Sequence, residues 1–502
     1  MALLINHCPV RWQALNHSDK IALQTDQHKI SYQVLDLYLI YLQKQLTPQI
    51  KKTTEQLTQH IKKTTEQQAQ QIKKTTKQQT TRLVCIASNS LELLLLQLLC
   101  VRLGWLFCPL NPRFTEAEIK QRLAILDSEY CWVDINEEAS ATHNAFNTLK
   151  IDFSIPGVST NTQLSPITIQ PEQACNIIFT SGSTGFPKAI VHHYKNHFFS
   201  ALGSQALIPL IEKDHNLLSL PLFHIGGYAT VMRSIIAGAC IHLTQSPLNS
   251  ILLQQRKITH LSLVSTQLTR LLTESTFNIT TCRIKHILLG GSAFPPTLLK
   301  KLAARGFNYH LSYGSTEMAS QIATSHNNNK LQLLPYRQIK IQEGEILLRG
   351  ETRFMGYFQD QKIIKIEENK WIFSNDTGRL DESSLTITGR KDRQFISGGE
   401  NIIPEEIERV CLQHQNVKQA YVHPTNNQKF GHRVALFVEF FDHKNVTFED
   451  QTKQLKQYLS SQLTRFKQPD HYFAWPQQSD NSQVLKVPKE SFILILRTQH
   501  LI

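Results

Sequence analysis

The chain has 502 residues, of which 41% are hydrophobic, enough for a large buried core, and this excludes a globally disordered protein. Its length exceeds that of an ordinary single domain, so we expect two or three domains. A formal net charge of +13 is compatible with a nucleic-acid partner, but part of that charge lies in one unusual segment. The first residues lack the basic and apolar regions of a secretory signal, so we expect a cytoplasmic protein.

The unusual segment is a threefold repeat at residues 49–81, which reads QIKKTTEQLTQ, HIKKTTEQQAQ and QIKKTTKQQTT. Its seven lysines and two glutamates carry +5, leaving +8 for the rest of the chain. Each unit has only one or two apolar side chains, so it has little to bury, and an 11-residue period keeps one stripe aligned along a helix. We therefore expect a solvated helical or disordered insertion, and no nucleic-acid partner.

Apolar segments typical of buried strands alternate with helical segments after the repeat. The expected strands are residues 82–88, 105–110, 130–134, 175–181, 216–220, 239–243, 261–264, 286–290 and 308–312. One helix should begin at Asn89 or Ser90 and end at Gly104, and Thr115 and Glu118 form the capping box of another. This alternation predicts an α/β fold of parallel, helix-covered sheets.

Two features of composition limit the alternatives. The most apolar stretch, 91–103, is interrupted by charged residues and is shorter than the roughly 20 residues that cross a bilayer, so we expect a buried helix and no membrane span. Nine cysteines occur singly, without a CxxC pair, which predicts reduced core thiols rather than disulfides or a zinc site.

Beyond about residue 335, the alternation of strands and helices gives way to shorter β segments. Residues 339–350 predict two short strands around a Glu343-Gly344 turn. Farther on, helices near 404–414 and 450–463 flank strands near 418–423 and 433–440. We expect a small α+β domain behind a large α/β domain that carries a β subdomain.

The strongest local motif follows the expected strand 175–181. It reads Thr180-Ser181-Gly182-Ser183-Thr184-Gly185-Phe186-Pro187-Lys188. Glycines let the backbone approach a ligand closely, hydroxyl and N–H groups donate to phosphate oxygens, and Lys188 adds a positive charge. The spacing is not that of the P-loop GxxxxGK[ST], which disfavours a Walker-type NTPase.

With this loop the chain resembles the adenylate-forming superfamily of acyl-CoA synthetases, luciferases and peptide-synthetase adenylation domains. The resemblance implies that Thr180, Ser181, Gly182, Ser183, Thr184, Gly185 and Lys188 hold the β- and γ-phosphates of ATP. Gly290-Gly291-Ser292-Ala293 resembles the adenine-side turn. Tyr313-Gly314-Ser315-Thr316-Glu317 matches the motif in which the tyrosine stacks near adenine, the threonine meets the α-phosphate and the glutamate supports Mg²⁺.

Later motifs follow in the family's order. Asp376 matches the aspartate that accepts from the ribose hydroxyls, and Arg390 matches a second ribose contact. Asp392 falls at the family's hinge, which implies a large domain 1–391 and a small mobile lid domain 392–502. Lys486 is the expected catalytic lysine, although Leu485 replaces the glycine that usually precedes it, and Ala189 replaces the glycine that usually follows the phosphate-loop lysine.

The resemblance is strongest to the o-succinylbenzoate–CoA ligases of menaquinone biosynthesis. It rests on residues 220–227, 232–233, 237–239, 262–268, 288–291, 397–402, 430–433 and 465–466. Such an enzyme uses ATP, Mg²⁺ and coenzyme A to adenylate a carboxylate and transfer the acyl group to a thiol. Because the acid is an aromatic dicarboxylate, its second carboxylate needs donors. Arg233 is the expected clamp, with Thr266 and Ser292 nearby and His224 at the mouth of the acyl pocket.

Three of these residues have ordinary explanations when taken singly. Glu317 alone is a helix-start acid, Asp376 a turn former and Arg390 a solvated charge. Their occurrence together in one order favours the superfamily. The alternatives are another aromatic or fatty acid–CoA ligase, or a non-catalytic binding protein, which the two missing glycines and the insertion suggest. The sequence leaves open whether the chain forms a homo-oligomer.

Overall fold

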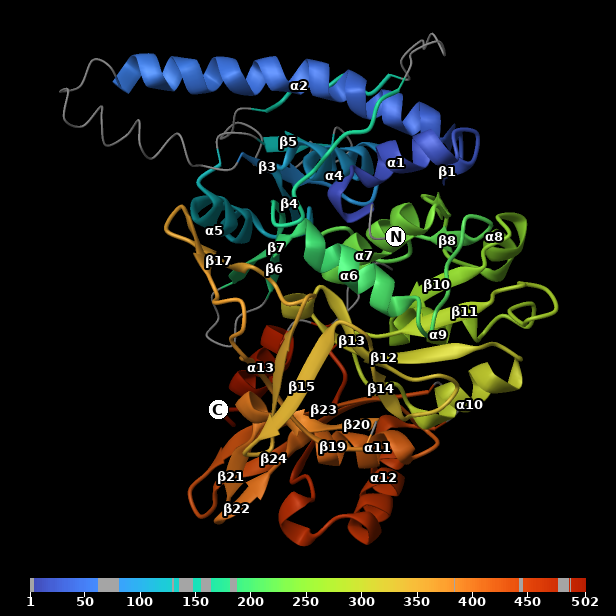
Figure 1. Ribbon diagram of the computed structural model, residues 1–502. Helices are drawn as coiled ribbons and strands as arrows, with labels where there is room; N and C mark the ends of the chain where they lie inside the picture. The colour runs from blue at the N-terminus through green and yellow to red at the C-terminus, as the bar shows by residue number, and fades with distance from the viewer. Residues whose placement is uncertain are drawn as a thin grey trace.

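The computed structural model describes residues 4–61, 81–128, 131–134, 148–154, 164–180, 187–382, 384–441, 446–476, 487 and 489–502, and the side chains of these except 50–61. The predicted loop residues Ser181–Gly185 and the predicted catalytic Lys486 therefore lie outside the described residues. Figure 1 shows the N-terminal helices at the top, two large sheets in the middle and the C-terminal elements at the bottom.

The first sheet has seven strands in the order β18-β17-β7-β6-β4-β3-β5. Its parallel part comprises β3 (Arg82–Ile86), β4 (Leu106–Leu110), β5 (Cys131–Val133) and β6 (Ala174–Thr180), as the sequence predicts. The sequence analysis did not predict strand β7 (Lys188–His193), which runs antiparallel to β6. The segment between the two strands is too short for the crossover that a parallel pair requires. Strands β17 (Gly356–Gln359) and β18 (Lys362–Lys365) extend the antiparallel side.

The second sheet has thirteen strands in the order β15-β16-β19-β20-β14-β13-β12-β11-β10-β8-β9-β1-β2. Its parallel centre comprises β8 (His215–Leu217), β9 (Cys240–His242), β10 (His260–Leu263), β11 (His286–Leu289) and β12 (Tyr309–Ser315). Strands β1 (Ile21–Gln24) and β2 (Lys29–Ser31) form one edge. The other edge is antiparallel and comprises β13 (Ser320–Thr324), β14 (Leu331–Leu333), β15 (Arg337–Gln342), β16 (Glu345–Gly350), β19 (Ile372–Asp381) and β20 (Ser384–Arg390). The predicted 339–350 hairpin is thus β15 and β16.

Two of the helices that cover the sheets confirm the predicted caps. Ser90 accepts from the Leu93 N–H at the start of α4 (Leu91–Leu103), and Gly104 ends it in the left-handed conformation. Thr115 and Glu118 form a complete capping box at α5 (Glu116–Leu126). The largest buried cluster joins α4 to α1 (Pro9–Asn16), α2 (Tyr32–Ile61), α6 (Tyr194–Ser204) and α7 (Ile225–Ala237). All nine cysteines are buried thiols, as expected.

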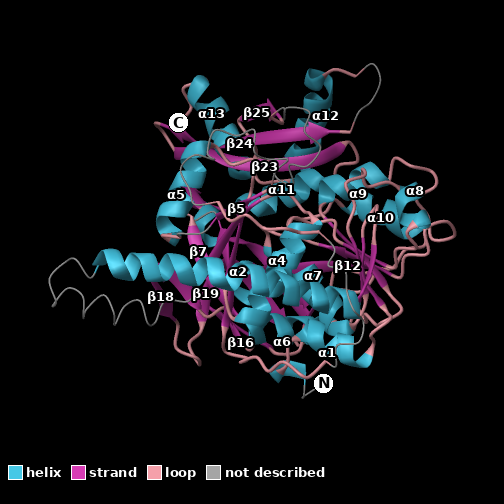
Figure 2. Cartoon of the chain, turned by 90° about the horizontal axis from the view of Figure 1, so that it is seen from above, coloured by secondary structure: helices cyan, strands magenta, loops and turns pink. Residues whose placement is uncertain are grey.

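The α2 helix continues into the first copy of the repeat. It runs across the top of the molecule in Figure 1, and its far end extends beyond the sheets in both views (Figures 1 and 2). Residues 62–80 lie outside the described part of the chain. Among the residues that are described, no helix is both long and apolar enough to cross a membrane.

The C-terminal elements build a separate five-stranded sheet with its own core. Its strands are β21 (Phe395–Ser397), β22 (Glu400–Ile402), β23 (Val417–Asn427), β24 (Gly431–Phe440) and β25 (His471–Ala474). The helices α11 (Pro404–Gln413) and α12 (Phe448–Gln462) confirm the predicted ones, whereas β25 and α13 (Lys489–Thr498) escape the sequence analysis. Ile402, Ile407 and Leu455 belong to a cluster of buried residues from this sheet and its helices.

Candidate nucleotide and acyl site

The carboxyl ends of the parallel strands in the two sheets lie side by side. Asn89, just after β3, donates to the Leu220 carbonyl over 2.9 Å and accepts from the Leu222 N–H over 2.8 Å in the segment after β8. Within the second sheet, the Gly290 N–H donates to the Leu263 carbonyl, which joins the ends of β11 and β10. Open α/β sheets bind ligands outside the carboxyl ends of their strands, so this shared edge is the expected site.

The predicted phosphate loop connects β6 to β7, and the end of β6 and the start of β7 lie at this edge. Thr180 and Lys188 are cross-strand partners at the two ends of that loop. The Lys188 Nζ lies 6.0 Å from the centre of the Tyr357 ring on β17 and forms no ion pair with any described residue. Its charge therefore remains available for a phosphate.

Thr316 and Glu317 form a 3₁₀ turn (Thr316–Met318) directly after β12. Glu317 is half-buried, and its carboxylate forms no ion pair within the described part of the chain. Burial, with a smaller contribution from the Glu317 charge, raises the pKa of Tyr357. Lys188 therefore lies near the Tyr357 ring, and Glu317 is near enough for its charge to act on the same residue.

Tyr313, Asp376 and Arg390 form one hydrogen-bonded group. The Tyr313 hydroxyl donates to Asp376 Oδ2 over 2.7 Å, and Arg390 Nη1 donates to Asp376 Oδ1 over 3.1 Å. Arg390 also holds the predicted hinge residue Asp392 through Nε and Nη2, at 2.8 and 3.0 Å. Burial raises the pKa of Asp376, and the hydrogen bond from Tyr313 and the charge of Arg390 oppose that shift. The structure therefore brings together three predicted nucleotide residues and the predicted hinge.

Gly291 follows β11 at the expected adenine side. Its φ of 87° lies in the left-handed region, where a residue with a Cβ is strained. A β-carbon there would lie 3.6 Å from a Val264 methyl group, so the turn passes close to the end of β10. Ser292 is solvent-exposed beside it.

Arg233 is a buried cation on α7, with 9% of its surface exposed. Its Nη1 donates to Gln321 Oε1 over 3.3 Å and its Nη2 to Thr230 Oγ1 over 3.2 Å, and no described carboxylate pairs with it. Burial lowers the pKa of Arg233 to about 10, which still leaves the guanidinium charged at neutral pH. The sequence analysis missed Gln321 and Thr230, because a neutral partner of a buried arginine has no motif of its own.

A small cavity lies against Arg233. Asn216, His260 and Ser262 are among its other lining residues. Its volume of about 20 Å³ accommodates a water molecule but no aromatic ring. The cavity therefore offers room beside the guanidinium for a water molecule and not for the ring of an aromatic acid.

The remaining acyl candidates, His224, Thr266 and Ser292, are exposed. His224 precedes the first turn of α7, with its ring 4.9 Å from the Phe223 ring, and Thr266 lies in the first turn of α9 (Ser265–Leu271). Among the hydrogen bonds of the described residues, none joins His224, Thr266 or Ser292 to Arg233. These residues are accessible to a ligand but do not form a preassembled cluster.

Comparison with known proteins agrees with this geometry. Residues 53–358 match the family of AMP-binding enzymes. The chain is 36% identical over 397 residues to the 2-succinylbenzoate–CoA ligase of Haemophilus influenzae, covering 78% of this chain and 82% of that one. It is 34% identical over 403 residues to the Escherichia coli ligase of the same name, covering 79% and 84%. The chain belongs to the 2-succinylbenzoate–CoA ligase family of AMP-binding enzymes.

Solved structures of this family share the whole fold. An E. coli MenE variant with bound OSB-AMS superposes with a TM-score of 0.78 at 28% identity, covering 98% of each chain. The o-succinylbenzoate CoA synthetase MenE of Bacillus subtilis, in complex with the acyl-adenylate intermediate OSB-AMP, gives 0.76 at 25% identity and covers 95% of this chain and 96% of that one. These likenesses confirm the predicted superfamily and α/β fold.

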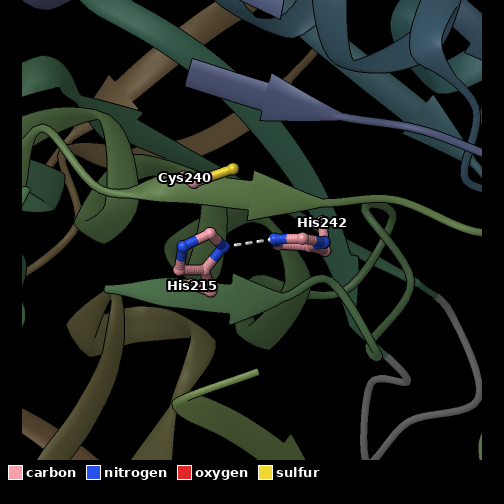
Figure 3. A group of neighbouring side chains, drawn as sticks. All are labelled: His215, Cys240 and His242. Atoms are coloured by element: carbon pink, nitrogen blue, oxygen red, sulfur yellow. Dashed lines mark hydrogen bonds between the residues drawn. The ribbon is translucent and has the colours of Figure 1, made fainter. Parts of the chain in front are cut away.

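Two places in this AMP-binding enzyme offer metal-ligand atoms, Glu317 and the group His215, Cys240 and His242. Glu317 offers the carboxylate oxygen that Mg²⁺ prefers. His215, Cys240 and His242 also gather ligand atoms, all within 4.8 Å of one another, on β8 and β9 (Figure 3). Their nitrogen and sulfur donors do not suit Mg²⁺, and His215 Nδ1 and His242 Nε2 already share a hydrogen bond of 2.7 Å. The magnesium candidate is therefore Glu317.

Proposed function

We propose that the protein is an ATP-dependent 2-succinylbenzoate–CoA ligase that works through an acyl-adenylate, the step of menaquinone biosynthesis that its family name implies. A carboxylate oxygen of the acid attacks the α-phosphorus of ATP, the bond to the bridging oxygen breaks, and pyrophosphate leaves. The CoA sulfur then attacks the carbonyl carbon of the adenylate, and AMP leaves as the carbon–oxygen bond breaks. Two curated relatives at 36% and 34% identity support this function.

The observation that carries the nucleotide assignment is the group around Asp376. An ionised carboxylate has about four acceptor positions, and Tyr313 and Arg390 use one on each oxygen. The remaining positions suit two ribose hydroxyls. Arg390, which also binds Asp392, provides a second contact to the sugar and links it to the proposed hinge.

The phosphate end requires positive charge, because two anions must react with each other. We assign Lys188 to the β- and γ-phosphates, together with Thr180 and the loop residues 181–185, and Thr316 to the α-phosphate. Glu317 would hold Mg²⁺, which neutralises phosphate oxygens when bound. Lys486, which lies outside the described residues, is assigned to the adenylation step on the family resemblance.

We propose that residues 392–502 turn as a lid about Asp392 between the two half-reactions. The separate core of the C-terminal sheet supports this division at 391/392. The contacts between the two parts include isolated hydrogen bonds, such as the one that Arg409 Nη2 donates to the Ile387 carbonyl over 3.2 Å. A turn of the lid would remove Lys486 and admit the CoA thiol, a gating motion of the kind that many enzymes use.

We assign the unreactive carboxylate of the acid to Arg233. This cation is buried, charged and held in place by Gln321 and Thr230, and it has no acidic partner among the described residues. His224, Thr266 and Ser292, which are exposed, would line the path to the nucleotide.

Pyrophosphate release with a panel of acids tests the function. With ATP and Mg²⁺ present, 2-succinylbenzoate should give much faster release than benzoate, a coumarate or a medium-chain fatty acid, and its CoA ester should follow when CoA is added. Faster release with one of the other acids would retain the adenylating reaction and contradict the substrate. Absence of release with all four would contradict the proposed function.

A further inference from the structure

Two buried polar side chains, to which the proposed function assigns no role, form hydrogen bonds with the main chain of the Thr316–Glu317 turn. His192 on β7 is fully buried, and its Nε2 lies 2.7 Å from the Thr316 carbonyl oxygen. At the other end of the turn, the Ser200 hydroxyl on α6 donates to the Ala319 carbonyl over 2.7 Å. The main chain between these two anchors carries both Thr316 and Glu317.

The hydrogen-bond network fixes where the His192 proton lies. The Asn176 Oδ1 accepts from His197 Nε2 over 2.7 Å, so the Asn176 amide nitrogen points toward His192. That nitrogen lies 3.1 Å from His192 Nδ1 and has only hydrogens to offer, so Nδ1 must accept. The ring proton therefore lies on Nε2, which donates to the Thr316 carbonyl. Burial also lowers the pKa of His192 to about 4, which keeps the ring neutral at physiological pH.

The turn itself needs such support, because its backbone is strained. Ala319 and Ser320 have φ values of 50° and 99°, in the left-handed region. Gly314 packs so closely that a β-carbon there would lie 2.1 Å from the Ser320 carbonyl oxygen. Without the His192 donor, the Thr316 carbonyl would keep only the 3.1 Å hydrogen bond from the Ala319 N–H, and the turn would lose one of the contacts that hold this conformation.

We propose that His192, oriented by Asn176, is a positioning residue that aims the Thr316–Glu317 turn at the magnesium-bound phosphates. This proposal rests on the assignments of Thr316 and Glu317 in the proposed function. His192 acts through the main chain of the turn and does not touch the nucleotide. Hydrogen-bond partners of this kind affect metal affinity or activity by about 10- to 100-fold when they are removed.

The test compares His192→Phe, His192→Gln and the neighbour control His193→Gln. Phenylalanine keeps the ring volume without a donor, whereas the glutamine side-chain amide can still donate to the Thr316 carbonyl. His193 Nδ1 contacts the Glu172 carbonyl at 2.7 Å, away from the turn. Pyrophosphate release is measured against Mg²⁺ concentration. His192→Phe should need about 10-fold more Mg²⁺ for half-maximal release, His192→Gln should restore most of the wild-type requirement, and His193→Gln should match wild type.

A second variant keeps the proposal testable if His192→Phe fails to fold. Ser200→Ala removes one hydroxyl at the other anchor of the same turn and should shift the Mg²⁺ requirement in the same direction. Thioester formation from supplied acyl-adenylate should be unchanged in all variants. A wild-type Mg²⁺ requirement in His192→Phe, or equal impairment of the phenylalanine and glutamine variants, would overturn the positioning role. Absence of pyrophosphate release from the wild-type protein would contradict the proposed function and this proposal together.

Discussion

At the scale of single residues, the proposed nucleotide site contains one cation, Arg390, that is shared by two carboxylates. Arg390 donates to Asp376 and to Asp392, so the proposed ribose ligand and the proposed hinge are joined through one guanidinium. Side-chain hydrogen bonding to Asp392 is the largest contribution to the raised pKa of Arg390, and the same bond lowers the pKa of Asp392. A ligand that takes hydrogen-bond positions on Asp376 therefore competes with Arg390, which is also bonded to Asp392 at the proposed hinge.

Asp376→Asn tests the ribose assignment. The amide keeps the shape of the side chain but loses its charge and one acceptor oxygen, so the KM for ATP should rise about 10- to 100-fold, the range of one or two hydrogen bonds to a charged group. Asp381→Asn, an exposed position later on β19, is the matched control and should leave the KM unchanged. An unchanged KM for ATP in Asp376→Asn would contradict the assignment.

Arg233→Gln tests the acid clamp. The variant keeps a hydrogen-bonding side chain but removes the buried charge, so the KM for 2-succinylbenzoate should rise about 10-fold or more while the KM for ATP stays the same. Arg270→Gln, at an exposed arginine on α9, is the control. Equal increases in both KM values would indicate a general loss of structure and would contradict the clamp.

At the scale of elements, the N-terminal helices are joined by a buried ionic triad. Asp36 on α2 is fully buried and pairs with Arg11 on α1, at 2.8 Å, and with Arg102 on α4. Asp36→Ala would leave two buried guanidinium groups unpaired. We expect its free energy of unfolding to fall by about 3–5 kcal/mol in urea denaturation, the range for one broken buried pair. The exposed control Asp19→Ala should change little, and a loss below about 1 kcal/mol in Asp36→Ala would contradict this role.

We predict that the repeat contributes little to the stability of the folded protein. The last buried side chain of α2 before the repeat is Leu46, and Gln49 donates to the Lys150 carbonyl over 3.2 Å. Replacing residues 51–80 by a short Gly-Ser linker keeps these contacts. It should change the free energy of unfolding by less than about 1 kcal/mol, since loop length acts weakly, and should leave pyrophosphate release intact. An inactive or unfolded product would contradict this view of the repeat.

The sequence predicts those elements whose signals are local. Helix α4 has its serine cap and terminal glycine, and α5 has its capping box, so both are predictable from a few neighbouring residues. The direction of β7 depends on a hairpin that the apolar pattern does not reveal. Strand β25 pairs with β24 only through contacts distant in the chain.

At the candidate nucleotide site, too, local motifs are predictable from the sequence and contacts between distant residues are not. Motifs predict Tyr313, Asp376 and Arg390, and the structure brings them together. The residues that support the site have no motif, because their contacts are distant in sequence: His192 and Thr316 are 124 positions apart. Tyr357 likewise meets Lys188 only because β17 pairs with β7.

At the scale of the whole molecule, buried neutral histidines make stability depend on pH. Burial lowers the pKa of His192 and His310 to about 4 and that of His242 to about 3, from an ordinary value of 6.5. The unfolded chain therefore binds more protons than the folded one below pH 6.5. Their contribution is complete above that pH and is lost as the pH falls from 6.5 toward 4.

Urea unfolding at pH 7.5 and 5.5 measures this effect. Each of the three histidines should lower the free energy of unfolding by about 1 kcal/mol between these values. His310→Gln should reduce the loss by one such step, whereas the exposed control His28→Gln should not. Equal stability of the wild-type protein at both pH values would contradict the prediction.

The whole molecule is expected to carry out two half-reactions through a bound acyl-adenylate. The most direct measurement is mass spectrometry of the protein incubated with ATP, Mg²⁺ and 2-succinylbenzoate, first without CoA and then with it. We expect the acyl-adenylate and pyrophosphate before CoA is added, and the CoA ester and AMP afterwards, with Lys188→Ala slowing the first stage. Formation of the CoA ester with ADP and phosphate, or no adenylate at any stage, would contradict the account.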